Sequence, residues 1–213
     1  MNEELDFPEE LVKAESGDPE AQYRVALRYM AGSGCPQDTE QALYWLEQAA
    51  ERDHRDAQFS LGYYYASGPE EKRDIAKAAH WFREAAEQGD RDAQYNIGVY
   101  YAHGHGVPQD DERAAYWFEK SASQGDPEAQ YVLGLCCAEG IGVVKDEVRA
   151  FNSFWQGARQ GNLNAQYRLG LCYAEGKGTP PDNTQAVYWL TRAAHEGLHE
   201  AQQALSKIYA KPD

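Results

Sequence analysis

The chain has 213 residues, of which 26% are charged and 12% aromatic, so it is long enough for one or two ordinary domains and is not of a disordered type. Its 35 acidic and 20 basic residues give a formal net charge of −15. This argues against binding of nucleic acid or of an anionic membrane surface, because both require basic patches. A neutral, basic or mixed-charge protein partner remains compatible with the composition.

The first residues, MNEELDFPEELVKAESGD, are acidic and lack the apolar segment of a signal peptide. No apolar run in the chain reaches the length of a membrane-spanning helix, so we expect no membrane insertion. We therefore expect a cytoplasmic protein, with a removed signal peptide as the alternative.

The dipeptide Ala-Gln occurs at residue 21 and then every 36 residues, at 57, 93, 129, 165 and 201. Glycine, tyrosine, aspartate and tryptophan columns keep the same phase. The tryptophan column consists of Trp45, Trp81, Trp117, Ser153 and Trp189. A fixed period of this length indicates stacked supersecondary units within a single domain.

In chain order, residues 1–20 are expected to form an N-terminal capping segment, with part of a helix in 7–18. Five repeats follow, and 201–213 is predicted to be a C-terminal capping helix. The repeats span residues 21–56, 57–92, 93–128, 129–164 and 165–200.

Two helices are predicted in each repeat. In 93–128, the first helix carries Ile97, Gly98 and Tyr101 on one stripe, and the second carries Trp117 and Phe118 on another. Asp-Pro-Glu at 18–20 and 126–128 suits the start of a first helix. The second helices are expected to be capped by the aspartate column, which is Asp38, Asp74, Asp110, Asp146 and Asp182.

The turn between the two helices reads G-x-G-V-x-x-D in 104-GHGVPQD-110 and 140-GIGVVKD-146. Partial forms are 32-GSGCPQD-38 and 176-GKGTPPD-182, whereas 68-GPEEKRD-74 lacks the second glycine. The first glycine is expected to end the first helix in a left-handed conformation. His103 and His105 flank this glycine, and the repetition of the turn favours a connector over a metal site.

The pattern A-Q-Y-x-L-G-x-x-Y-x-x-G-x-G-V-x-x-D, followed by Ala, Trp and Ala-Ala, resembles the Sel-1-like repeat family, which is related to tetratricopeptide repeats. The resemblance implies an all-α fold, a right-handed α/α superhelical solenoid of helix-turn-helix repeats. It also implies a concave side that binds a partner. Members of this family are typically bacterial or eukaryotic adaptors and are usually not enzymes.

Some secreted bacterial members of this family carry a disulfide pair in each repeat, and penicillin-binding activity has been ascribed to them. This chain lacks that pairing, because Cys136 and Cys137 are adjacent and Cys172 is alone in its repeat. Cys137 stands in the tyrosine column and is expected in the core. Cys136 and Cys172 share a column with Arg28, Tyr64 and Tyr100, which we place off the core stripe.

The segment 195-HEGLH-199 matches the zinc-protease pattern H-E-x-x-H. Its middle residue, Gly197, stands in the column that ends the second helices, so His195 and His199 are not expected on one continuous helix. We therefore predict no metal, no cofactor and no catalytic residue.

The candidate partner-binding surface is the face of the first helices opposite the core stripe, because its residues vary between repeats. Tyr63, Tyr64 and Tyr100 cluster there in adjacent repeats, and tyrosine suits interfaces. The full set is Arg24, Leu27, Arg28, Ser60, Tyr63, Tyr64, Asn96, Val99, Tyr100, His103, Val132, Leu135, Glu139, Arg168, Leu171 and Glu175. In the fourth repeat, Trp155 is expected to be partly exposed.

These observations favour a non-catalytic scaffold or adaptor that binds a peptide or protein element in its concave groove. The alternatives are an inhibitor or immunity protein for a bacterial effector, a hydrolase or metalloenzyme, and a repeat protein without a partner.

Overall fold

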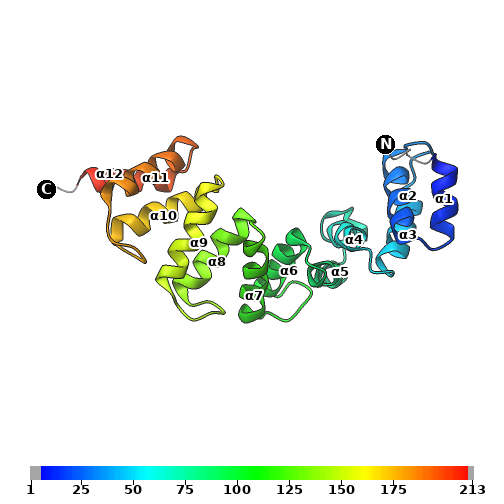
Figure 1. Ribbon diagram of the computed structural model, residues 1–213, viewed down its shortest axis with the longest axis horizontal. Coiled ribbons are helices and arrows are strands. Elements are labelled where there is room, and N and C mark those ends of the chain that lie inside the picture. Colours follow the sequence, from blue (N-terminus) through cyan, green and yellow to red (C-terminus); the bar gives the residue numbers. More distant parts are fainter. Residues whose placement is uncertain (1–5, 211–213) are drawn as a thin grey trace. The chain divides into compact units, whose positions relative to one another are not determined.

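The computed structural model describes residues 6–210 and contains, within that range, twelve α-helices, one 3-10 helix and no strand (Figure 1). The fold expected from the repeats, an all-helical chain of helix-turn-helix units, is confirmed. The helices are α1 (Phe7–Glu15), α2 (Pro19–Ala31), α3 (Thr39–Ala50), α4 (Arg55–Ser67), η1 (Glu70–Lys72), α5 (Ile75–Glu87), α6 (Arg91–His103), α7 (Asp111–Ser123), α8 (Pro127–Glu139), α9 (Glu147–Arg159), α10 (Leu163–Glu175), α11 (Asn183–His195) and α12 (His199–Tyr209).

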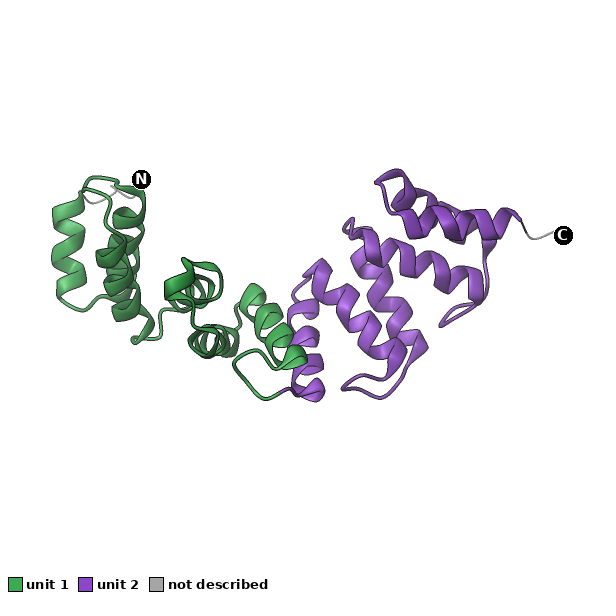
Figure 2. Ribbon diagram, turned by 180° about the vertical axis from the view of Figure 1, so that it is seen from behind, with its two compact units in different colours: residues 1–108 green, residues 109–213 purple. Residues whose placement is uncertain are grey.

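The chain divides into two compact units, residues 1–108 and residues 109–213 (Figure 2). The first unit contains α1 to α6 and the second contains α7 to α12. Within each unit, a second helix packs against the first helix of its own repeat and against the next first helix. Thus α3 contacts α2 and α4, and α9 contacts α8 and α10.

Side-chain caps define where these helices begin. The expected aspartate caps of the second helices are confirmed at all five positions, where each carboxylate accepts a backbone N–H of the first turn. Asp18 and Asp126 cap α2 and α8 in the same way, each followed by proline. His54 replaces the aspartate before α4, and its Nδ1 accepts the N–H of Ala57 at 3.2 Å.

The glycine that follows the first helix adopts the expected left-handed conformation in four repeats, at Gly32, Gly104, Gly140 and Gly176. The expectation is wrong in the second repeat, where Gly68 is extended with φ −69° and ψ −170°. Pro69 follows it and the chain turns through η1, so the departure of 68-GPEEKRD-74 from the turn pattern has a structural counterpart.

The second glycine of the turn packs against the start of the preceding second helix. A Cβ atom at Gly106 would collide with the carbonyl of Ile75, and one at Gly142 with the carbonyl of Asp111. Both glycines also have positive φ angles, which other residues adopt only at a cost. The turn is therefore a contact between neighbouring repeats, which explains its repetition.

The glutamine of each Ala-Gln pair joins successive repeats. In the first five pairs its side chain is buried, and its Nε2 donates to the carbonyl of the residue eight positions earlier, at the end of the preceding second helix. The N···O distances are 3.1 Å for Gln58 to Ala50, 3.1 Å for Gln94 to Ala86 and 3.2 Å for Gln130 to Ala122. Gln22 makes the same bond to Ala14 of α1, so α1 acts toward α2 as a second helix does.

Candidate partner-binding groove

The two arginines of the candidate surface in residues 1–108 are held by carboxylates of the same unit. Arg28 Nε lies 2.6 Å from an oxygen of Glu10, a residue of α1 whose side chain is only 3% exposed. Arg24 Nε donates to Glu20 at 2.8 Å. Both guanidinium groups are therefore engaged within the chain rather than left for a partner.

The three candidate tyrosines do not share one surface. Tyr63 is 62% exposed, but Tyr100 is only 8% exposed. The Tyr100 ring packs edge-on against Phe82, with 5.6 Å between ring centroids, and burial raises its pKa. Tyr64 is half-buried.

The column that contains Tyr100 is more buried than the helical pattern suggested. Cys136 and Cys172 in this column are also buried, which corrects the expectation that they lie off the core stripe. Cys137 is fully buried, as expected for the tyrosine column.

Two other candidates in residues 1–108 form hydrogen bonds with the backbone of their own helix. Ser60 Oγ donates to the carbonyl of Asp56 at 2.7 Å, and Asn96 Nδ2 donates to that of Asp92 at 2.7 Å. Leu27 and His103 are exposed and Val99 is half-buried. The centroids of the His103 and His105 rings lie 5.4 Å apart, and the Tyr100 ring also lies beside His105.

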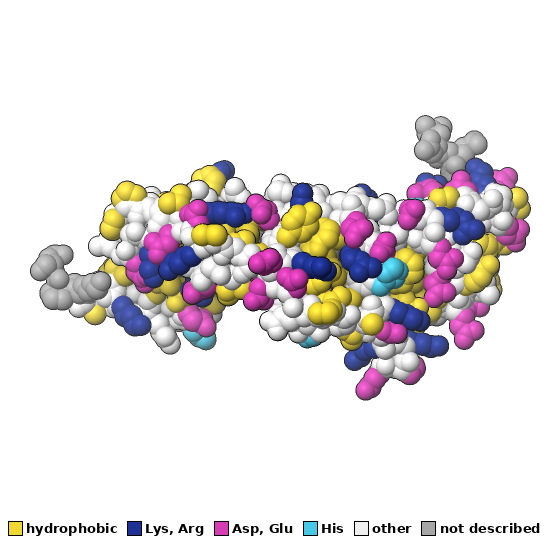
Figure 3. Space-filling model, turned by 90° about the horizontal axis from the view of Figure 1, so that it is seen from below, with side chains coloured by type: hydrophobic (Ala, Val, Ile, Leu, Met, Phe, Trp, Pro, Cys, Tyr) yellow, Lys and Arg dark blue, Asp and Glu magenta, His cyan; other side chains and the backbone are white. Residues whose placement is uncertain are grey.

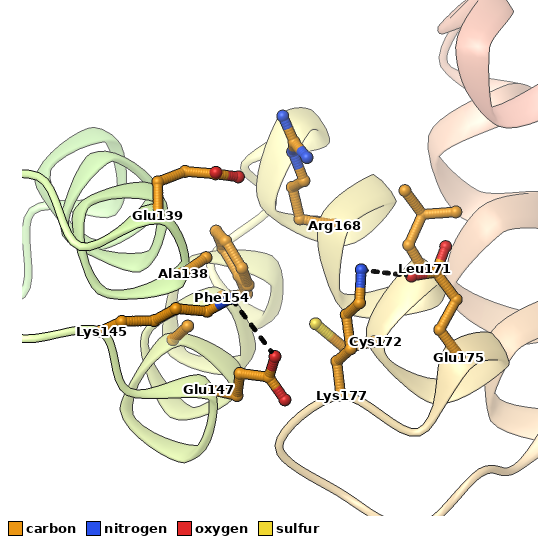
Figure 4. Close-up of a pocket in the computed structure, with 11 residues that line it drawn as sticks. Ala138, Glu139, Lys145, Glu147, Phe154, Arg168, Leu171, Cys172, Glu175 and Lys177 are labelled. Atoms are coloured by element: carbon orange, nitrogen blue, oxygen red, sulfur yellow. Dashed lines mark ion pairs between the residues drawn. The ribbon is translucent and has the colours of Figure 1, made fainter.

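In residues 109–213, four candidates line one pocket of about 250 Å³ between α8, α9 and α10 (Figure 4). These are Glu139, Arg168, Leu171 and Glu175. Its apolar wall includes Phe154, Ala150 and Cys172, and the remaining lining residues are Ala138, Lys145, Glu147 and Lys177. Val132 and Leu135 of α8, the other candidates in this unit, are half-buried and lie outside this lining.

The charged side chains of this pocket are partly paired with one another. Lys177 Nζ lies 2.7 Å from Glu175, which raises the lysine pKa through their hydrogen bond, and Lys145 Nζ lies 3.8 Å from Glu147. Glu139 and Arg168 have no ion-pair partner among residues 6–210. The pocket thus offers one uncommitted carboxylate and one uncommitted guanidinium.

A second pocket, of about 360 Å³, lies between α10 and α12 and shares Leu171 and Glu175 with the first. Ala204 and Ile208 of α12 add apolar wall, and Glu200 and Lys207 add charge. We call the two pockets together the α10 groove. It combines apolar walls with charged rims of both signs.

The sequence pattern missed those groove residues that come from the turns and the second helices. Lys145, Glu147 and Lys177 follow the glycines of two turns, whereas the variable positions that indicated a partner surface lie on the first helices. The pattern also missed Tyr44, Tyr116 and Tyr188, which are exposed and stack edge-on against the tryptophan that follows each of them. The sequence signal for these exposed side chains is a tyrosine directly before the tryptophan of three repeats.

Trp155 is 38% exposed, as expected, and the Arg159 guanidinium lies 4.6 Å from the centre of its ring. The neighbouring Ser153, in place of tryptophan, is buried and its hydroxyl donates to the carbonyl of Arg149. The fourth repeat has therefore repacked around a smaller residue.

The H-E-x-x-H segment is interrupted, as expected. The helix α11 ends at His195, Gly197 has a φ of +96°, and α12 begins at His199. Among residues 6–210, no three His, Cys, Asp or Glu side chains are grouped as metal ligands would be.

The family model for the Sel1 repeat matches five segments of the chain, 19–54, 55–90, 91–126, 127–162 and 163–198. The matches have the period found in the sequence and begin two residues before the Ala-Gln pairs. No curated protein sequence matches the chain.

Among solved structures, a Sel1 repeat protein from Oxalobacter formigenes is 34% identical with a TM-score of 0.81, over 92% of this chain and 81% of that one. A protective antigen of uropathogenic Escherichia coli strains, c5321, displays an SLR fold and is 30% identical with a TM-score of 0.78. That alignment covers 96% of this chain but only 52% of c5321, so this chain spans about half of it.

No helix within residues 6–210 is long and apolar enough to cross a membrane.

Proposed function

Because the chain belongs to the Sel1 repeat family, we propose that it is a non-catalytic scaffold or adaptor that holds a peptide or protein element in the α10 groove. Sel1 repeat proteins generally mediate protein–protein interactions. The observation that carries the proposal for this chain is the pair of adjoining pockets, with apolar walls and charged rims, that share Leu171 and Glu175. Neighbouring apolar pockets with charged rims suit successive side chains of a bound segment.

The charges of the groove favour a partner with a mixed or basic sequence. The whole chain is acidic, with a net charge of −15, which attracts basic partners over a distance. Within the groove, Arg168 offers donors to a carboxylate and Glu139 offers acceptors to a cation. Acidic, basic and apolar side chains are also interspersed on the face in Figure 3.

A binding role also fits the chemistry of the groove thiol. Burial raises the pKa of Cys172 to about 11, so the side chain is protonated at neutral pH and is a poor nucleophile. We further propose a cytoplasmic location, supported by four cysteines that are all free thiols.

A selection from a phage library of random peptides tests the proposal. Peptides that bind the intact chain would be compared on two variants that leave the net charge unchanged. The groove variant carries Glu139→Lys and Arg168→Glu, and the control variant carries Glu112→Lys and Lys120→Glu on α7, outside the groove. Fluorescence anisotropy measures each affinity.

We expect the groove variant to bind the selected peptides about tenfold or more weakly, a loss of about 1.4 kcal/mol, because both uncommitted charges are reversed. The control variant should bind as the unmodified chain does. If both variants bind every selected peptide with unchanged affinity, the groove is not the binding surface and the proposal fails.

A further inference from the structure

Two equivalent places in the chain differ in the residue that faces a buried phenylalanine. Tyr100 and Cys172 stand in the same column two repeats apart, and so do Phe82 and Phe154. In the first unit the Tyr100 ring covers Phe82 at 5.6 Å and an interplanar angle of 77°. In the second unit, Cys172 and Phe154 line the pocket of about 250 Å³.

Two small apolar residues are the same in both places, whereas the polar rims differ. Ala138 and Ala150, which line the pocket, correspond to Ala66 and Ala78 in the first unit. Figure 4 shows the Cys172 sulfur directed toward the side of the pocket that holds Phe154. A thiol is much smaller than a phenol ring, so the exchange of tyrosine for cysteine leaves the space in front of Phe154 open.

The size of the opening fits one side chain. Small-molecule sites usually have volumes of about 300–1,000 Å³, above that of this pocket. Aromatic pairs prefer edge-on or offset contact, and Tyr100 shows that a ring in this place meets the phenylalanine edge-on.

We propose that the pocket in front of Phe154 receives a tyrosine or phenylalanine side chain of a partner peptide, in the place that Tyr100 occupies in the first unit. This inference rests on the proposed function and names the residue type that the α10 groove selects. Arg168 and Glu139 lie at the opening and contact charged or polar groups that flank the aromatic residue. The chain would thus recognise an aromatic residue within a polar segment.

An NMR titration of the full chain with N-acetyltyrosinamide tests the inference directly, with N-acetylleucinamide as the comparison probe. We expect saturable shifts of the backbone amides around Phe154 and Cys172 with the tyrosine probe, and binding of the leucine probe that is severalfold weaker. Equal affinity for the two probes, or no saturable shift near Phe154, would overturn the aromatic assignment.

Two substitutions at the same position provide the matched comparison. Cys172→Ser keeps the opening and should bind N-acetyltyrosinamide within about twofold of the unmodified chain. Cys172→Tyr should fill the space as Tyr100 does and weaken binding at least about tenfold. Unchanged binding of N-acetyltyrosinamide by Cys172→Tyr would overturn the inference. Cys172→Leu provides a second filled variant, and circular dichroism verifies that each variant is folded.

The two proposals fail separately. If selected peptides depend on Glu139 and Arg168 but contain no aromatic residue whose change to alanine weakens binding, the scaffold proposal stands and this inference is wrong. If N-acetyltyrosinamide binds at Phe154 while the selected peptides ignore the groove charges, the groove assignment in the scaffold proposal is wrong.

Discussion

The glutamine of each Ala-Gln pair shows at the scale of one residue why a column repeats. Gln58 is 2% exposed, and a buried amide without a partner costs about 1–3 kcal/mol. Its Nε2 donates to Ala50, and its Oε1 accepts from Gln88 Nε2 at 2.8 Å. Both ends of the amide are thus satisfied between two helices, which few other side chains of this size can do.

Burial also controls the chemistry of the cysteines. It raises the pKa of both Cys136 and Cys172 to about 11, whereas Cys35 lies half-exposed in a turn. A thiol with a pKa of 11 is thiolate only to about one part in a thousand at pH 8, and the thiolate is the reactive form.

We therefore predict that iodoacetamide modifies Cys35 first at pH 8, and that Cys136 and Cys172 react only slowly in the folded chain. Their rates should rise as the pH approaches 11, as long as the protein stays folded. Mass spectrometry of timed samples measures this, with a urea-unfolded sample as the reference. Equal rates for Cys35 and Cys172 in the folded protein would contradict the burial of this column.

At the scale of helices, the contact between the two helices of a repeat depends on a small residue facing a large one. A Cβ atom at Gly62 would lie 2.7 Å from the Phe82 ring, too close for any real contact, and one at Gly170 would lie 2.7 Å from Leu190. In the first repeat the corresponding residues are Ala26 and Leu46, which are both fully buried in one cluster. Phenylalanine thus occurs with glycine in this contact, while leucine occurs with alanine as well.

Gly62→Ala should destabilise the protein by about 1–3 kcal/mol through overpacking. The better helix propensity of alanine offsets up to about 1 kcal/mol of this loss. In the background of Phe82→Leu, which reproduces the alanine–leucine pair of the first repeat, the same change should cost much less. Urea unfolding of the two single variants and the double variant gives the coupling energy, expected at about 0.5–3 kcal/mol. Additive effects would show that the two side chains do not compete for space.

A second link between helices is incomplete in the fifth repeat. Gln160 of the fourth repeat donates to Gln130 at 2.8 Å, but Glu196 stands at the corresponding position and the buried Oε1 of Gln166 has no hydrogen-bond partner. At neutral pH a carboxylate cannot donate a hydrogen bond, so Glu196 cannot replace the glutamine.

Glu196→Gln should therefore stabilise the protein by about 0.5–1.5 kcal/mol, because it provides the missing donor for Gln166. The reverse change in the fourth repeat, Gln160→Glu, should destabilise it by about 1–3 kcal/mol, because it leaves Gln130 without a donor. Thermal unfolding at pH 7 measures both variants. Shifts of the two unfolding temperatures in the same direction would disprove the hydrogen-bond link between these positions.

For the molecule as a whole, the repeats share a scaffold but differ in charge. Residues 1–108 contain 21 acidic and 10 basic residues, a net charge of −11, and residues 109–213 contain 14 and 10, a net charge of −4. The α10 groove lies in the less acidic half, where Lys145, Arg168 and Lys177 offset the three carboxylates of the first pocket. This local balance is compatible with a peptide that carries both charges.

The sequence alone determined the period, the two helices of each repeat and most of their ends. These features depend on local chemistry: an aspartate before a helix caps it, a glycine after it turns the chain, and apolar residues at helical spacing mark one face. The second repeat was the exception, because Pro69 changed the turn without changing the helices around it.

Only the tertiary structure decided which candidate residues are available to a partner. The first helices α4, α8 and α10 each pack against the second helix of their own repeat and that of the preceding one, and α6 packs against α5, so more of their surface is buried than a single stripe. For this reason Tyr100 is covered by Phe82, and Arg28 is held by Glu10 of α1. The opening beside Cys172 depends on the small cysteine of one helix facing Phe154 of another, a pairing that no pattern within one helix contains.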